Sequence, residues 1–218
     1  MKKHNYFLFL FMVSYQFSSA QETAPQHSLD ERVKAFLQRH KNQWNDMNIP
    51  MCDGQLLYDL IIENKYTRAL EIGTSTGHSS VWIAWALSKT GGKLITIEID
   101  ERRHKQALLN FEEASVSEYI DARLADAHRL VRELKGPFDF VFSDADKEWY
   151  KQYFIDIAPK MSVGGCFTAH NVPLRRGQGG IGRGVREFVD YIQGMPNFET
   201  TIENSRSSGI SISFKKKE

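Results

Sequence analysis

The chain has 218 residues, and 41% of them are hydrophobic, which is enough to bury one substantial core. Its 28 basic and 27 acidic side chains nearly cancel, so the overall charge does not indicate a nucleic-acid partner. Cys52 and Cys166 are too few for a disulfide scaffold and lack the paired spacing of a zinc site. We therefore expect one domain that binds no nucleic acid.

The N-terminal segment has the pattern of a targeting sequence. A basic start is followed by an apolar run over residues 6–13 and by small residues up to Ala20. This order predicts a signal peptide over residues 1–20. The apolar run is too short to remain as a stable membrane anchor. The single domain, residues 21–218, is then expected to be exported, periplasmic or secreted; if the peptide is not processed, the protein stays cytoplasmic.

Two helices are expected before the sheet begins. Apolar side chains at helical spacing over residues 29–37 predict an amphipathic lead-in helix. Pro50 and Asp53-Gly54 predict a turn. A second helix is expected after this turn and should end near Asn64.

From residue 69 onward, short apolar runs alternate with segments that have helical periodicity. Strands are expected at residues 69–72, 94–97, 120–124, 138–142 and 166–169. Covering helices are expected at residues 81–87, 102–114, 128–134 and 149–157. A last helix at 185–192 precedes two closing strands at 199–202 and 210–214. The pattern predicts an α/β, Rossmann-like fold with a mostly parallel, seven-stranded sheet and helices on both faces.

In such sheets a ligand binds beyond the carboxyl ends of the strands. The first strand runs into a loop from Glu71 to Ser79, where Gly73 permits close approach of the backbone and the next helix offers free amides. A ligand carboxylate or phosphate would suit this loop. The loop is not the dinucleotide motif GxGxxG, because Ser75 occupies the position of the middle glycine. A plain strand-to-helix turn is the alternative.

The next two strands end in residues that suit a nucleoside. Glu98 closes the second strand and places a carboxylate where a ribose would present its hydroxyls. An ordinary solvated strand end is the alternative for Glu98. The third strand delivers Ala125-Asp126-Ala127, which offers an edge for an adenine ring.

Charged side chains gather after the fourth and fifth strands. Asp144 and Lys147 follow the fourth strand, and His170-Asn171 follow the fifth. Carboxylate, imidazole and amide oxygen from adjacent strand ends would form a partly filled coordination sphere for a cation. In the metal-free alternative, Asp144 pairs with Lys147 and His170 is only hydrogen-bonded.

Taken together, these motifs resemble the cation-dependent S-adenosylmethionine O-methyltransferases, the group that contains catechol and caffeoyl-CoA O-methyltransferases. The resemblance runs from about Met47 to the C-terminus and is strongest over residues 70–79, 96–99 and 138–144, with Lys147 three positions further on. It implies a class I methyltransferase fold and transfer of a methyl group from S-adenosylmethionine to an oxygen of a small acceptor, catechol-like or phenolic.

The same resemblance implies a role for individual residues. The expected cofactor contacts are Ile49, Glu71, Gly73, Ser79, Glu98, Ala127 and Asp144. Lys147 is expected to be the catalytic base that takes the proton of the acceptor hydroxyl. The expected ligands of a divalent cation, Mg²⁺ or Mn²⁺, are Asp144, His170 and Asn171. Family members usually have Asp-Asn after strand five, and an imidazole in place of the carboxylate favours borderline ions over Mg²⁺.

Two other functions provide alternatives to this one. An exported, non-catalytic protein that keeps the fold and binds S-adenosylmethionine or a nucleoside remains an alternative, because that cofactor is made inside cells and His170 replaces an expected ligand. A nicotinamide-dependent dehydrogenase would need the glycine motif that is missing here. The sequence does not identify the small-molecule acceptor, and the resemblance leaves a homodimer open.

Overall fold

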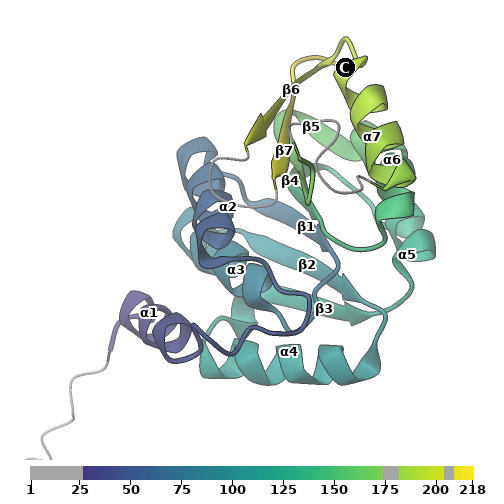
Figure 1. Cartoon of the computed structure of the whole chain (residues 1–218). Helices are drawn as coiled ribbons and strands as arrows, with labels where there is room; N and C mark the ends of the chain where they lie inside the picture. Colours follow the sequence, from purple (N-terminus) through teal and green to yellow (C-terminus); the bar gives the residue numbers. More distant parts are fainter. Residues whose placement is uncertain (1–26, 174–181, 204–208) are drawn as a thin grey trace, which may run out of the picture.

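A computed structural model describes residues 27–173, 182–203 and 209–218. The predicted signal peptide lies outside these residues. Within them, the chain forms a seven-stranded sheet of order β3-β2-β1-β4-β5-β7-β6 (Figure 1). Strands β1 to β5 pair in parallel, and β7 pairs antiparallel with both β5 and β6. The predicted α/β architecture with a mostly parallel sheet is confirmed.

The strands follow the apolar runs of the sequence closely. They are β1 Arg68–Ile72, β2 Lys93–Glu98, β3 Ile120–Leu124, β4 Phe138–Ser143, β5 Met161–His170, β6 Phe198–Glu203 and β7 Ile210–Lys215. Strand β5 begins before the predicted start at Cys166. Its first residue, Met161, pairs with Phe138, and the register then shifts before Phe140 pairs with Cys166. Ser162 and the pair Gly164-Gly165 interrupt the apolar pattern in this part of the strand.

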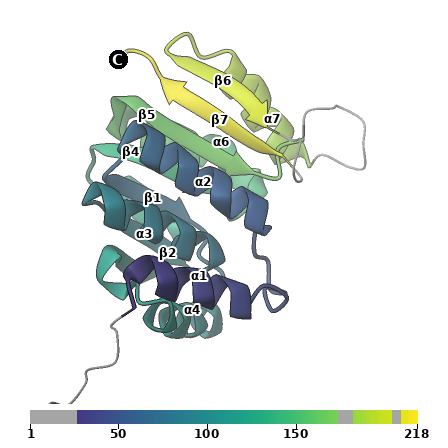
Figure 2. The ribbon, with the colours of Figure 1, turned by 90° about the vertical axis from the view of Figure 1, so that its left-hand side faces the viewer.

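Helices cover both faces of the sheet (Figure 2). One face carries α1 Leu29–Arg39, α2 Met51–Asn64, α3 His78–Thr90 and α4 Glu101–Glu113. The other face carries α5 Ala127–Glu133, α6 Tyr150–Ile157 and α7 Arg183–Gln193. Short 3-10 turns lie at Ser117–Tyr119, Lys147–Trp149 and Ala158–Lys160. No helix in the described ranges has the length and apolarity needed to cross a bilayer.

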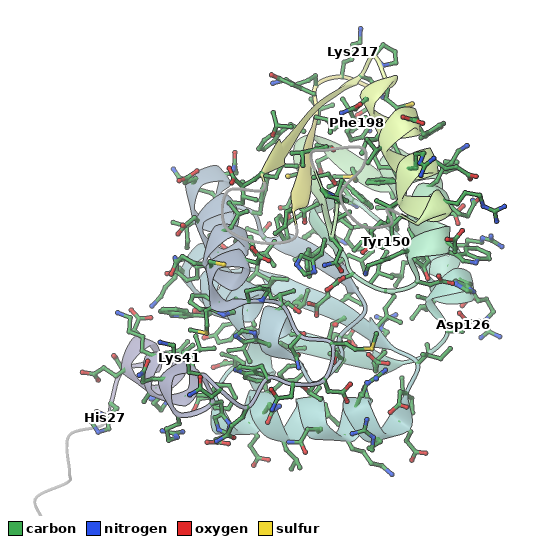
Figure 3. The ribbon with its side chains drawn as sticks, viewed as in Figure 1. His27, Lys41, Asp126, Tyr150, Phe198 and Lys217 are labelled. Atoms are coloured by element: carbon green, nitrogen blue, oxygen red, sulfur yellow. The ribbon has the colours of Figure 1, made fainter. Side chains whose placement is uncertain are left out.

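The core on the second face is built around aromatic side chains. Phe154 packs edge-on against Phe167 of β5, with ring centroids 5.2 Å apart, and also contacts Phe188 of α7. Tyr150, at the start of α6, lies inside the protein between the sheet and α7 (Figure 3). Burial of each such side chain contributes roughly 1.5–3 kcal/mol to the hydrophobic stabilisation.

The predicted turn at Asp53-Gly54 is wrong, because both residues lie in the first turns of α2 and are buried. The helix begins at Met51, directly after Pro50, whose extended backbone forms the N-cap. Gly54 allows α2 to pack tightly on α3, since a Cβ atom at this position would lie 2.2 Å from Cδ1 of Trp82. Tertiary packing therefore overrides the local turn preference of an Asp-Gly pair.

Candidate functional site

A cavity of about 720 Å³ opens at the carboxyl ends of the parallel strands. Its size falls within the range of sites for small molecules. The cavity brings together most of the residues selected from the sequence: its walls include Gly73, Glu98, Ala127, Asp144, Lys147, His170 and Asn171. Loops after β1, β2, β3, β4 and β5 thus converge on one site, as expected for an open parallel sheet.

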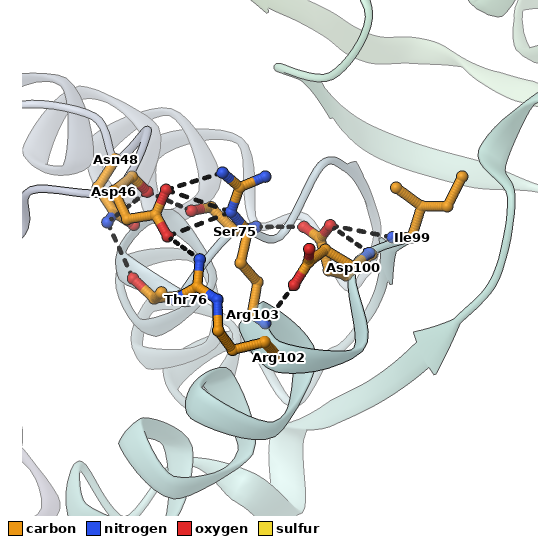
Figure 4. A network of polar contacts seen from close by, with 9 residues as sticks. Asp46, Asn48, Ser75, Thr76, Ile99, Asp100, Arg102 and Arg103 are labelled. Carbon is orange, nitrogen blue, oxygen red and sulfur yellow. Dashed lines mark hydrogen bonds and ion pairs between the residues drawn. The ribbon is translucent and has the colours of Figure 1, made fainter.

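The Glu98 carboxylate is held by backbone amides, which belong to Ser75, Ile99 and Asp100, all labelled in Figure 4. Its Oε2 accepts a hydrogen bond from the N–H of Ser75 at 2.7 Å. Its Oε1 accepts from the N–H groups of Ile99 and Asp100 at 3.0 and 2.9 Å. An ionised carboxylate has about four acceptor positions, so these three bonds leave capacity for a ligand hydroxyl. The side chain is 94% buried in the protein, since only 6% is exposed, yet it borders the cavity.

Gly73 lets the loop after β1 approach the loop after β4. Its φ is +101°, and a Cβ atom here would lie 2.9 Å from the carbonyl oxygen of Asp144. The N–H of Asp144 in turn donates to the carbonyl of Ile72 at 2.9 Å. Any side chain at position 73 would push these two loops apart, so the floor of the cavity depends on glycine.

Glu71 and Ser79, two predicted cofactor contacts, lie behind the cavity wall and do not line it. The Glu71 carboxylate accepts hydrogen bonds from the hydroxyls of Ser80 and, at 2.6 Å, Thr96. Burial raises the pKa of Glu71 to about 7; nearby hydroxyls, including that of Ser79, oppose the rise, and the charge of Asp144 adds to it. Glu71 therefore supports the loop from beneath, and its contact with a cofactor stays a prediction.

Ile49, the remaining predicted cofactor contact, is also buried outside the cavity lining. Its carbonyl oxygen lies 2.8 Å from Nδ1 of His78 at the start of α3. Burial lowers the pKa of His78 to about 4, so the ring is neutral, Nδ1 donates to Ile49, and Nε2 accepts from Trp82 at 3.2 Å. This bond fastens the segment before α2 to the helix that follows the glycine loop.

The segment before α2 contributes cavity residues that the sequence did not reveal. Met47 and Asn48 line the cavity, and so does Arg103 of α4. Asp46 joins these parts: its carboxylate accepts from Arg103 at 2.8 Å, and its carbonyl accepts from the Ser75 hydroxyl (Figure 4). The sequence feature that could have indicated this segment is a polar stretch before Pro50, and such stretches are common in loops.

Four charged side chains form a chain of contacts that ends at the cavity. Nε2 of His170 lies 2.9 Å from Asp53 of α2, and Nδ1 lies 3.1 Å from Oδ2 of Asp144. The other Asp144 oxygen, Oδ1, lies 3.2 Å from Nζ of Lys147. Burial alone lowers the pKa of His170, but hydrogen bonds and attraction to Asp144 and Asp53 outweigh it and raise the pKa to about 9. The ring therefore carries a positive charge at neutral pH.

Tyr150 contacts two residues of this charge network from inside the protein. Its hydroxyl donates to the carbonyl oxygen of His170 at 3.1 Å and lies 3.4 Å from Oδ1 of Asp144. Burial raises the pKa of Tyr150 well above its usual value, so the hydroxyl keeps its proton and acts as a donor. The tyrosine thereby ties the end of β5 to the loop that follows β4.

The sequence matches the model of a known protein family. The family model described as "O-methyltransferase" matches residues 18–178. The chain belongs to the O-methyltransferase family. The resemblance to catechol and caffeoyl-CoA O-methyltransferases is thereby confirmed at the level of the family.

Curated relatives within the O-methyltransferase family align over parts of the chain. A catechol O-methyltransferase from Niastella koreensis is 42% identical over 89 residues, which is 39% of this chain and 40% of that protein. Caffeoyl-CoA O-methyltransferase 1 from Eucalyptus globulus is 32% identical over 136 residues, 60% of this chain and 55% of that protein. The chain thus spans about half the length of the curated relatives it matches.

A solved O-methyltransferase structure matches almost the whole chain. The O-methyltransferase TomG from Streptomyces achromogenes, in complex with S-adenosylmethionine, superimposes with a TM-score of 0.71 at 25% identity. The match covers 92% of this chain and 94% of TomG. Together with the strand order, it establishes the class I methyltransferase fold.

The side chains at the expected cation site do not match the ligands expected for a cation-dependent O-methyltransferase. Among the residues described, no three side chains of His, Cys, Asp or Glu converge in a way that could hold a metal ion. Both ring nitrogens of His170 face carboxylates, and a protonated imidazole has no lone pair for a metal. Asp144 already contacts Lys147 and His170. The predicted site of Asp144, His170 and Asn171 therefore finds no support in the geometry.

Proposed function

We propose that this protein is an S-adenosylmethionine-dependent O-methyltransferase that acts on a small hydroxylated acceptor, catechol-like or phenolic. The observation that carries the proposal is the single cavity that Gly73, Glu98 and Lys147 share at the carboxyl ends of three strands. Membership of the O-methyltransferase family and the likeness to a structure bound to S-adenosylmethionine support it.

The cavity offers a suitable group for each part of the cofactor. Glu98 has acceptor capacity left for the ribose hydroxyls, and the Gly73 loop allows the amino-acid part to approach the backbone. Ala125 and Ala127, which follow β3, provide an apolar edge for adenine. These positions follow one another around the cavity, so one nucleoside could contact all of them.

The protein must orient the acceptor oxygen and remove its proton, since S-adenosylmethionine itself supplies an electrophilic methyl group. Lys147 lies at the mouth of the cavity, where 39% of its side chain is exposed. Asp144 holds the lysine through the 3.2 Å contact with Nζ. In the proposed reaction, an uncharged Lys147 amine accepts the proton of the acceptor hydroxyl as the methyl group is transferred.

A methyl-transfer screen tests this function. The purified chain is incubated with S-adenosylmethionine and separate catechols, simple phenols and aliphatic alcohols, and mass spectrometry detects the added methyl group. Calorimetry with S-adenosylhomocysteine measures cofactor binding in parallel. We expect binding and methylation of an aromatic hydroxyl. If S-adenosylhomocysteine does not bind, the proposal is overturned. If it binds but no acceptor is methylated, the non-catalytic binding protein is favoured.

We also propose that the protein is exported. The basic start and the apolar run before Ala20 support this, although residues 1–20 lie outside those that the structure describes. Cell fractionation with N-terminal sequencing tests it. A mature N-terminus at Gln21 in the exported fraction is expected, and an intact Met1 in the cytoplasm would contradict it.

A further inference from the structure

The position at which a divalent cation was expected contains a buried charge network instead. It runs from Asp53 in α2, through His170 and Asp144, to Lys147 at the cavity. The side chains of Asp53 and His170 are only 3% and 6% exposed. The imidazolium of His170 lies between the two carboxylates and offsets part of their negative charge. A divalent cation added to this set would lie close to the imidazolium and be repelled by it.

Asp53 accounts for the orientation of the imidazole. A carboxylate only accepts hydrogen bonds, so an ionised carboxylate at each ring nitrogen requires a proton on each. A contact with Asp144 alone would require a proton only on Nδ1. Asp53 lies 117 positions earlier in the chain and reaches Nε2 at 2.9 Å. The second carboxylate therefore fixes the ring as a doubly donating cation.

The packing of α2 makes this contact available. Asp53 is followed by Gly54, whose missing side chain allows the helix to lie directly against Trp82. Asp53 is in the first turn of the helix, where the free N–H groups favour a negative charge. The first turn of α2 thus keeps the carboxylate of Asp53 close to His170.

We propose that His170, clamped between Asp53 and Asp144, takes the place of the divalent cation in this protein and excludes a metal from the site. This inference rests on the proposed function. The imidazolium orients Asp144 through Nδ1, and Asp144 orients Lys147 through Oδ1. His170 is therefore a positioning residue that also supplies fixed positive charge at the wall where the acceptor oxygen would lie.

Manganese titration followed by electron paramagnetic resonance tests the exclusion of metal. The full chain is titrated with Mn²⁺ alone, and the free-ion signal reports binding. We expect no stoichiometric site in the parent protein. His170→Asp restores a carboxylate beside Asp144 and Asn171, and we expect it to bind one Mn²⁺ at least about 10-fold more tightly than the parent protein. Adding Asp144→Asn to His170→Asp is the matched control and should abolish the new site.

Each outcome decides the proposal. One Mn²⁺ bound by the parent protein and lost in Asp144→Asn would overturn it, and so would a folded His170→Asp variant that binds no Mn²⁺. If His170→Asp fails to fold, the parent protein is compared with Asp144→Asn alone. In that case the absence of an Mn²⁺ site in the parent protein supports the proposal. These titrations use neither S-adenosylmethionine nor an acceptor, so their result does not depend on whether methyl transfer is found.

A second readout is methyl transfer, which should resist chelators in the parent protein and depend on Mn²⁺ in His170→Asp.

Discussion

The backbone N–H of Ser75 donates a hydrogen bond to Oε2 of Glu98 at 2.7 Å and thereby joins the loops that follow β1 and β2. Two consecutive loops of the cavity wall are thus fixed by one carboxylate. The remaining oxygen, Oε1, accepts from two further amides. Glu98 consequently shapes the cavity and also lines it, so its replacement should affect the proposed binding of the cofactor.

Glu98→Gln should weaken the binding of S-adenosylhomocysteine by roughly 10- to 100-fold, because the amide NH₂ group cannot accept hydrogen bonds from the backbone or the ribose. Calorimetry measures the affinity, and circular dichroism checks the fold. Glu101→Gln is the matched control, since its carboxylate contacts only Lys105 at the surface among the ion pairs described, and the affinity should stay at the parent value. Unchanged affinity in Glu98→Gln would place the ribose elsewhere.

Lys147→Met should lower turnover of an aromatic acceptor by about 100- to 10,000-fold, the usual contribution of a general base. The affinity for S-adenosylhomocysteine should change little, because Met keeps most of the aliphatic chain. Lys151→Met serves as control: this lysine lies over the ring of Tyr191, 5.1 Å from its centroid, and is not part of the cavity wall. Turnover near the parent rate in Lys147→Met would mean that another group takes the proton.

Glu71→Gln should reduce the pH dependence of stability near neutrality. The folded protein raises the pKa of Glu71 from its usual value of 4.5 to about 7, chiefly by burial. The corresponding stability is fully present below pH 4.5 and is lost as the pH rises through about 7. Urea unfolding at about pH 5.5 and pH 8 should therefore show a smaller loss of unfolding free energy in Glu71→Gln than in the parent protein. Glu63 is exposed, and Glu63→Gln should show the same loss of unfolding free energy between the two pH values as the parent protein. The same loss in Glu71→Gln would show that Glu71 does not titrate in this pH range.

Gly54→Ala should lower the free energy of unfolding by about 1–3 kcal/mol, because the new methyl group would overlap the indole of Trp82. Gly194→Ala is the matched control. A Cβ atom there meets the carbonyl oxygen of Tyr191 at 3.4 Å, an ordinary contact, so the change should stay within about 0.5 kcal/mol. Chemical denaturation of both variants gives the comparison, and equal stabilities would argue against tight packing of α2 on α3.

Much of the fold follows from periodicity alone. Apolar runs separated by helical segments predict a parallel sheet because buried strands and amphipathic helices have different repeats. The strand ends then select Glu98, Asp144 and Lys147, since parallel strands bring their carboxyl ends to one edge. These residues do share the cavity wall.

What the sequence did not reveal depends on contacts between distant segments. Asp53 was interpreted as part of a turn because Asp-Gly favours turns locally, whereas its helix is fixed by packing against Trp82. Its partner His170 is 117 positions away, and no spacing rule connects them. The metal prediction depended on the residue types at the strand ends, and it could not account for a carboxylate arriving from another helix.

The position of β7 between β5 and β6 imposes an order on assembly. Strand β6 is synthesised before β7, yet in the sheet it pairs only with β7, within the described residues. Before β7 docks, the chain therefore exposes the unpaired edge of β5, and β6 has no strand to pair with. An unpaired edge of this kind can template pairing with another chain. A partly folded chain in which β7 has left the sheet would accordingly lose the pairing of β6 as well and expose two strand edges to aggregation.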